Sequence, residues 1–440
     1  MLTRLRAAAH SINASYWFFP ALFAILALLL ASLTIQLDRS GWADWLGEIV
    51  WLHPARPDGA SNMLTVIAGS MIGVASTVFS ITIAAVAYAS GTYGPRLLTN
   101  FMEDRGNQLS LATFIGTFVY SLTVLRTVRT SEEQNLLSTA GGIGDMSGFV
   151  PQLSLLVAYG LMALSIAVLV YFLNHIPASI RINTVLQEIG ERLIHDIGTI
   201  FPDPADGGVE MKAPQGTPVN SQDTGYIQVI DFEGLDALAR GHDAVMKLAV
   251  RTGDFIHRDL PLVYWAGDKP PKDIDGEVRD CFALGGMRTP NQDLHFLIDE
   301  LVEIGLRALS PGINDPFTAV TSVHWLGAAT AQLGQRKLVR SFGEARNPNE
   351  DCLVLLNDDF AHYIQRGFGG LRSAMAASPI AAIVGFDAMA KAATTLEDAS
   401  RRADLANEVD QLMRQARECL TGPDLEQVEA SYQELKAKRN

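Results

Sequence analysis

The chain has 440 residues, 48% of them hydrophobic and 19% charged, and a soluble enzyme normally carries a higher charged fraction. Its formal net charge is −14, but the first 173 residues carry 8 basic and 9 acidic side chains, so the acidic excess lies in the remainder. An acidic surface repels nucleic acid, which argues against nucleic acid as a partner.

Four apolar segments within the first 175 residues predict four transmembrane helices. About 20 apolar residues span the hydrocarbon core of a bilayer as a helix, and only a helix satisfies its own backbone there. The helices are expected at about residues 16–37, 62–90, 109–128 and 150–173, within a transmembrane domain of residues 1–175. The lipid bilayer is therefore the first predicted partner.

The charges around the first segment predict its orientation. Arg4 and Arg6 precede it without a nearby acid, whereas the following loop, residues 38–61, carries more acids than bases. The positive-inside rule then places the N-terminus in the cytoplasm, and four crossings return the chain there. We expect a multi-pass protein of the bacterial inner membrane with both termini cytoplasmic.

Cys281, Cys352 and Cys419 are widely spaced, which argues against a disulfide framework and a zinc site and fits a reducing compartment.

The second segment carries small and hydroxyl side chains every three or four residues. Small residues let membrane helices approach closely, and hydroxyls can bond across the contact or line a polar path. Two interpretations stay open: packing within one subunit, or a pore around a symmetry axis. The residues of this stripe are Gly69, Gly73, Ser76, Thr77, Ser80 and Thr82. Arg96, just beyond, is expected at the inner interface, against lipid phosphate, the soluble domain or a pore mouth.

The remainder reads as a soluble α+β module followed by helices. Residues 176–222 suggest an amphipathic helix and a flexible loop, rich in Pro, Gly and Asp. Alternating apolar residues predict short strands and helices over 223–290, and helical periodicity predicts a helical domain over 291–440. The predicted fold class is thus a membrane α-helical part followed by a cytoplasmic α+β module and an α-helical bundle.

A loop between two of the helices predicted within residues 291–440 has the group of polar residues that most resembles a binding site. Asp315 suits a helix N-cap and Pro316 the first helical position, so a structural role is one interpretation. The other is a site for an ion or small anion, because an arginine and an Asn-Asp pair share one fixed loop. Its residues are Arg307, Ser310, Pro311, Gly312, Asn314, Asp315 and Pro316.

Four stretches resemble a bacterial family of predicted membrane proteins that is classified as a domain of unknown function. They are VFSITIAAVAYASGTYGPRLL (residues 78–98), GYIQVID (225–231), RTGDFIHRDLPL (251–262) and LIDELVEIGLRALSPGINDPFTA (297–319). They occur in order along nearly the whole chain, with Gly305 as a departure where the family pattern leads us to expect alanine. The resemblance implies the architecture and leaves the activity open.

Motifs for catalysis or cofactor binding are missing from the sequence. The nine histidines form no His-x-x-x-His or His-Glu-x-x-His motif, and neither a phosphate-binding loop nor a nucleophile elbow occurs. We therefore predict no catalytic residue, no metal and no cofactor.

The leading hypothesis is a homo-oligomeric ion channel or passive transport protein with a cytoplasmic regulatory domain, for which ions or a small ligand are candidate partners. A membrane-anchored sensor or signalling scaffold is the alternative, and a membrane enzyme comes third.

Overall fold

The computed structural model describes residues 16–42, 56–94, 104–128, 149–201, 216–266, 274–339 and 352–439. Their contacts divide the chain into two compact units. The membrane unit holds the apolar helices of residues 10–91 and 95–181, and the C-terminal unit is formed chiefly by residues 182–440.

The four predicted transmembrane helices are confirmed as helices long and apolar enough to cross a bilayer. They begin and end within six residues of their expected bounds. The second helix is the longest, with 37 residues, or about 55 Å at 1.5 Å per residue. The helices are α2 (Phe18–Arg39), α3 (Pro57–Tyr93), α5 (Arg105–Leu125) and α7 (Gln152–Ser179).

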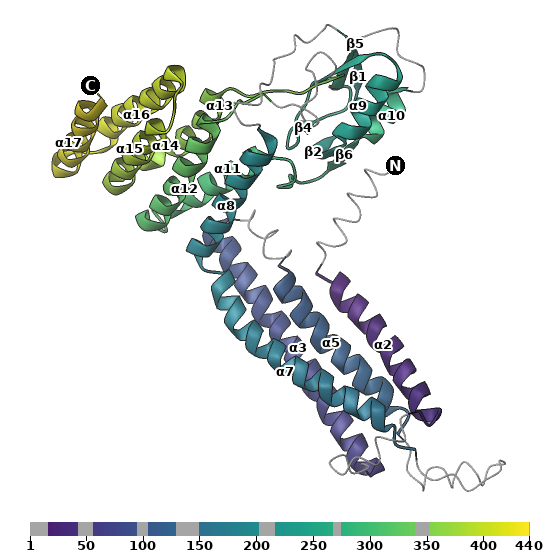
Figure 1. The fold of residues 1–440 in the computed structure, drawn as a ribbon. Helices are drawn as coiled ribbons and strands as arrows, with labels where there is room; N and C mark the ends of the chain where they lie inside the picture. The colour runs from purple at the N-terminus through teal and green to yellow at the C-terminus, as the bar shows by residue number, and fades with distance from the viewer. Residues whose placement is uncertain are drawn as a thin grey trace. The chain divides into compact units, whose positions relative to one another are not determined.

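Helix α5 is the central helix of the membrane unit (Figure 1). It packs against α2 and α7, and its buried face carries polar as well as apolar side chains. The Thr117 hydroxyl lies 3.0 Å from that of Ser165 on α7, and the Tyr120 hydroxyl lies 2.9 Å from that of Thr34 on α2. Hydrogen bonds between helices thus supplement side-chain packing, as expected where lipid provides little hydrophobic drive.

Acidic side chains cap two of these helices. Asp38, at the end of α2, accepts hydrogen bonds from the backbone N–H groups of Leu153 and Ser154 at 2.8 and 3.0 Å, which satisfies the open first turn of α7. Asp104 caps α5 and also lies 2.7 Å from Nε2 of His175 on α7. Both contacts hold α7 to its neighbours near the helix ends.

The C-terminal unit contains two small sheets, one mixed and one antiparallel, and their strands share one apolar core. One sheet has the order β1-β5-β3-β7 and the other β4-β2-β6. Alternate residues of the strands are buried, among them Ile227, Met246 and Val263. The strands are β1 (Thr217–Asn220), β2 (Gly225–Ile230), β3 (Val245–Leu248), β4 (Phe255–Ile256), β5 (Pro261–Ala266), β6 (Phe282–Gly285) and β7 (Leu353–Val354), with the helices α9 (Phe232–Gly241) and α10 (Ile274–Asp280).

Strand β7 joins this module from a distant part of the sequence. It pairs in parallel with β3, although two long helices separate the strands along the chain. Sequence periodicity predicted the module over 223–290, and β7 lies outside that range because two residues give no period to detect. The pairing brings the segment after β7 next to the start of helix α11 (Leu294–Ala308).

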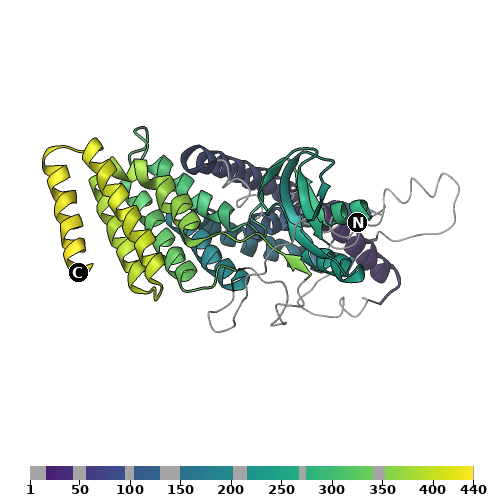
Figure 2. The same ribbon diagram turned by 90° about the horizontal axis from the view of Figure 1, so that it is seen from above.

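The remaining helices of this unit lie side by side in an array (Figure 1, Figure 2). Helix α12 packs on α8, α11 and α15, and α15 packs on α16 and α17. A short π-helical turn, η4 (Gln365–Gly369), connects α13 to α14. The bounds are α8 (Ile182–Ile200), α12 (Pro316–Gly334), α13 (Phe360–Ile364), α14 (Gly370–Ala376), α15 (Pro379–Thr394), α16 (Ala399–Cys419) and α17 (Gly422–Arg439).

Candidate functional site

The start of α11 lies against a tight turn of the β module. Asp293 caps the helix, because its Oδ1 accepts from the backbone N–H of Phe296 at 3.1 Å. Its other oxygen accepts from Arg288 at 2.6 Å and lies directly beside Gly253. Gly253 has a φ of +90°, and a side chain there would collide with the Asp293 carboxylate. Glycine is therefore required for this close approach.

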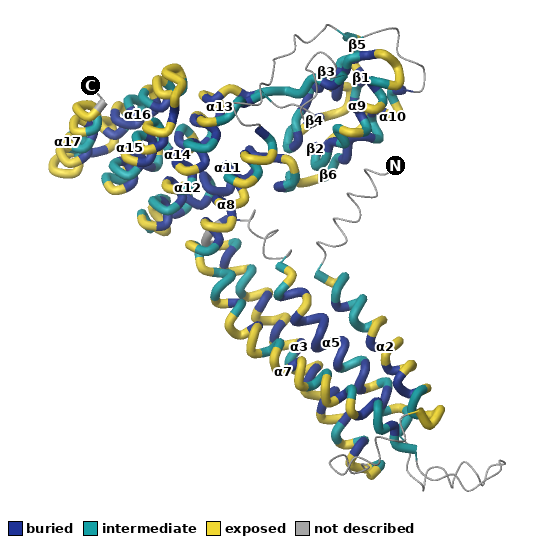
Figure 3. The backbone as a smooth tube through the Cα atoms, viewed as in Figure 1, coloured by how far each residue is buried: buried dark blue, intermediate teal, exposed yellow. Residues whose placement is uncertain are grey.

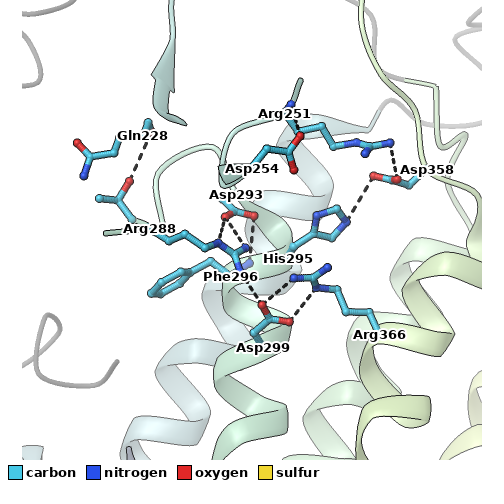
Figure 4. Close-up of polar contacts among 11 residues, drawn as sticks. Gln228, Arg251, Asp254, Arg288, Asp293, His295, Phe296, Asp299, Asp358 and Arg366 are labelled. Atoms are coloured by element: carbon cyan, nitrogen blue, oxygen red, sulfur yellow. Dashed lines mark hydrogen bonds and ion pairs between the residues drawn. The ribbon is translucent and has the colours of Figure 1, made fainter. Parts of the chain in front are cut away.

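Asp299, six residues further along the chain on α11, bridges two arginines (Figure 4). Arg288 donates to it at 2.7 Å, and Arg366 from the π turn donates with two nitrogens at 2.8 and 2.7 Å. Burial alone would raise the pKa of Asp299, but the two guanidinium groups outweigh it and hold the pKa below its ordinary value. The bridge ties the β module, α11 and the π turn together.

A second polar group lies beside this bridge, on the segment that follows β7. Asp358 pairs through Oδ1 with Nη2 of Arg251 at 2.6 Å. Its Oδ2 faces Nε2 of His295 on α11 at 3.4 Å, and Nε2 of His362 on α13 lies 4.0 Å from Oδ1. We call His295, Asp358 and His362 the His–Asp–His cluster.

Two atoms of this cluster are buried without a hydrogen bond among the described residues. They are Nε2 of His295 and Oδ2 of Asp358, and the two residues are only 7% and 8% exposed. Burial alone would raise the pKa of Asp358, yet His295, Arg251 and His362 together lower it, so the carboxylate is ionised at neutral pH. Burial is also the largest influence on His362 and lowers its pKa, which favours a neutral imidazole.

The three side chains of the cluster are of the types that can bind a metal ion. The ligand atoms of the three residues all lie within 4.8 Å of one another. Neutral imidazole and carboxylate are common ligands of divalent transition metals. The π turn η4 begins three residues after His362, and such turns are frequent at functional sites. No step of catalysis follows from these residues alone.

Sequence reasoning missed this cluster because its members come from separate elements. His295 and His362 are 67 positions apart, and Asp358 is followed directly by another aspartate, which is common on protein surfaces. The spacing Asp358-x-x-x-His362 was the one local signal, and it does not reveal His295. The expectation of no metal rested on local motifs, which cannot report a ligand set assembled by β7 pairing.

The predicted stripe on α3 lies on the outer surface of the membrane unit. Gly69 and Gly73 are exposed, and a Cβ built on either would meet no atom within 4 Å. The exposed hydroxyls of Ser76, Thr77 and Ser80 each donate to the carbonyl four residues earlier in the helix, at 2.8 to 3.0 Å. Figure 3 shows the exposed outer faces of these helices.

Thr82 does not belong with the other residues of the stripe. It is 2% exposed and lies on the buried face of α3, because a helix turns by about 100° per residue and Thr82 is therefore about half a turn from Ser80. Arg96, the other predicted membrane-proximal residue, lies outside the described residues.

The predicted loop motif has well-defined internal contacts. Asp315 caps α12 by accepting from the backbone N–H and the hydroxyl of Thr318 at 3.2 and 2.6 Å, and Pro316 occupies the first turn. Asn314 adopts a φ of +51°. The Ser310 hydroxyl donates to the carbonyl of Arg307 at 2.6 Å, and Pro311 and Gly312 are exposed. Helix α11 separates this loop from the His–Asp–His cluster by about 22 Å.

Comparison with known proteins adds a family and distant relatives. The profile of a family described as "Predicted membrane protein (DUF2254)" matches residues 13–391. An uncharacterized protein of Mycobacterium bovis is 29% identical over 371 residues, a span of 82% of this chain and 68% of the relative. An uncharacterized protein of Mycobacterium tuberculosis H37Rv matches with the same identity and coverage. No solved structure matches the chain significantly.

Proposed function

The chain belongs to the DUF2254 family of predicted membrane proteins, and from that premise we propose that it is a homo-oligomeric channel or passive transport protein. It resides in the bacterial inner membrane with both termini in the cytoplasm. Subunits meet along α3, and ions or small solutes pass beside its hydroxyl groups. The C-terminal unit, on the cytoplasmic side, regulates the pathway.

The observation that supports this proposal is the direction in which the α3 stripe faces. Leu64, Met71 and Val78 bury one side of α3 against the other helices. At about 100° per residue, Gly69, Gly73, Ser76 and Ser80 project from the opposite side. A face of small residues presented away from the other membrane helices suits contact with a second copy of the helix.

The distribution of charge in the membrane unit favours a passive pathway. In the described parts of the four membrane helices, Asp, Glu, Lys and Arg occur only in the first or last turn. A transporter driven by protons normally has carboxylates at depth, whereas a pore can be lined by hydroxyls and backbone carbonyls. Four helices per subunit are few for a closed pathway, so several subunits around an axis are required.

The experiment that tests this proposal is ion flux through purified protein reconstituted in liposomes. The test variant combines Ser76→Leu, Thr77→Leu and Ser80→Leu, which fills the small face and removes its hydroxyls. The control combines Ile72→Leu, Phe79→Leu and Ile83→Leu, which changes exposed positions on the flank of the same helix. We expect flux in the wild type and control and only background flux in the test variant. Background flux for the wild type across cations, anions and pH values would contradict the proposal.

A second candidate function is a membrane-anchored sensor, and the His–Asp–His cluster favours it. Unsatisfied polar atoms are costly inside a protein and are retained where a ligand satisfies them. Absence of flux together with saturable binding to the C-terminal unit would support this function over a channel.

A further inference from the structure

We propose that His295, Asp358 and His362 bind one divalent transition-metal ion of the zinc class, through two imidazole nitrogens, one carboxylate oxygen and water. The inference concerns the C-terminal unit alone and does not depend on whether the membrane unit conducts.

The first argument is the unmet bonding capacity of the two most buried members. Nε2 of His295 and Oδ2 of Asp358 are shielded from solvent and form only a long ion pair with each other, at 3.4 Å, with no further hydrogen bond among the described residues. Burying polar atoms whose bonding capacity is unmet is unfavourable. A cation between the two atoms would satisfy both at once, since the nitrogen offers a lone pair and the oxygen a negative charge.

The second argument is the spacing of the ligand atoms. Ligands about 2.0–2.1 Å from a tetrahedral ion lie about 3.3–3.4 Å apart. The His295–Asp358 separation of 3.4 Å already matches this geometry. Nε2 of His362 lies 4.0 Å from the other oxygen, Oδ1, and the ligand atoms of the three residues all lie within 4.8 Å of one another, so His362 must move inward by up to about 1.5 Å. Its side chain is 41% exposed, so it has room to rotate.

The exposure of His362 also identifies the fourth ligand. Because one side of the cluster is open to solvent, water can complete the coordination. Three protein ligands with an open position are typical of sites that bind or exchange a small ligand, whereas structural zinc sites are closed by four protein ligands. Two imidazoles select zinc, iron or a similar ion over calcium and magnesium, which prefer oxygen ligands.

The surroundings can accept the added charge. Arg251 pairs with Oδ1 of Asp358, which leaves Oδ2 for the ion. Residues around a metal site commonly hydrogen-bond to the metal ligands in this way and hold them in a fixed orientation. The carboxylates of the neighbourhood outnumber its guanidinium groups by one, so a dication meets a net negative site. These groups, shown in Figure 4, are Asp254, Asp293, Asp299 and Asp358 against Arg251, Arg288 and Arg366.

The ion would join parts of the chain that the sequence separates widely. His295 is on the first turn of α11, Asp358 follows β7 and His362 is on α13. A bound ion links these elements in the folded state only, so binding must raise the unfolding temperature of the C-terminal unit.

The test uses full-length, tag-free protein in detergent, stripped with a chelator and titrated with Co²⁺ and then Zn²⁺. We expect one equivalent of Co²⁺ to give visible absorption, one equivalent of Zn²⁺ to abolish it, and either ion to raise the unfolding temperature. His362→Ala and Asp358→Asn should each lose the absorption and the temperature shift. The control His324→Ala, at an exposed histidine of the same unit, should keep both.

Three results would overturn the proposal. They are titration without absorption or temperature shift, binding retained in both cluster variants, and binding lost in the His324→Ala control. His362→Ala removes a partly exposed side chain, so its unfolding temperature without metal should equal that of the stripped wild type. That equality separates loss of a ligand from loss of folding.

Discussion

The exposed face of α3 and the junction around Asp299 in the C-terminal unit satisfy their polar groups over different distances along the chain. On α3, the hydroxyls of Ser76, Thr77 and Ser80 bond to carbonyls four residues earlier. In the C-terminal unit, Asp299 bonds to Arg366 and Arg251 to Asp358, across 67 and 107 positions. Lipid supplies no hydrogen-bond donors or acceptors, so the polar groups on the exposed face of a membrane helix form hydrogen bonds within that helix. In the C-terminal unit, ion pairs fix distant elements together.

This difference predicts where single substitutions do most damage. Asp299→Asn removes a partly buried charge that two arginines share, and breaking such a pair costs about 3 kcal/mol of folding free energy. The measurement is chemical unfolding of the C-terminal unit within the full-length protein. Asp387→Asn is the matched control, because its pair with Lys391 is largely exposed and should contribute well under about 1 kcal/mol. Equal effects of the two substitutions would contradict the role given to Asp299.

Gly253→Ala should destabilise the same junction by about 1–3 kcal/mol, through its left-handed backbone and its contact with the carboxylate of Asp293. Chemical unfolding again measures the effect. Gly241→Ala makes a suitable control, since a Cβ there meets no atom within 4 Å and the residue ends α9. A Gly253→Ala protein as stable as the wild type would show that the turn can shift away from α11.

The junction should also weaken in acid. The folded state lowers the pKa of Asp299, so its stabilisation is complete above the unfolded value of about 3.9 and is lost as the pH falls through the folded value. Stability of the wild type should therefore fall more steeply below about pH 4 than that of Asp299→Asn, measured by unfolding at several pH values. Parallel pH profiles would contradict this assignment.

The smallest effect is expected inside the membrane unit. Tyr120→Phe removes one hydroxyl that contacts Thr34 at 2.9 Å and the carbonyl of Ser154 at 3.1 Å. Hydrogen bonds between membrane helices contribute about 0.6 kcal/mol on average, so the loss should be about 1 kcal/mol. Thermal unfolding in detergent measures it, with the exposed Tyr159→Phe as control. A loss of several kcal/mol would mean that polar contacts, more than packing, hold these helices.

The sequence predicted most of the fold where local pattern determines structure. Four apolar segments identify the membrane helices, and Asp315-Pro316 correctly marks the start of α12. The sequence could not identify β7, which has two residues and acquires its role only by pairing with β3. It also could not show that Thr82 is buried while Ser80 is exposed, because small and hydroxyl residues occur on both faces of α3.

The candidate metal site was beyond sequence prediction for the same reason. His295, Asp358 and His362 become neighbours only when β7 pairs and α13 packs near α11. The loop from Arg307 to Pro316 looked more site-like in sequence because its polar residues are contiguous. In the structure, the Ser310 hydroxyl donates to the carbonyl of Arg307 within the loop, and Asp315 accepts from the backbone N–H of Thr318 at the start of α12.

The most direct test of subunit contact along α3 is disulfide cross-linking in native membranes. The protein would carry Gly73→Cys in a background where Cys281, Cys352 and Cys419 are replaced by serine, and Ile83→Cys would serve as the flank control. We predict that mild oxidation converts the Gly73→Cys protein to a covalent dimer much faster than the Ile83→Cys protein. Equal rates for both, or no dimer from Gly73→Cys, would contradict assembly through the small-residue face of α3.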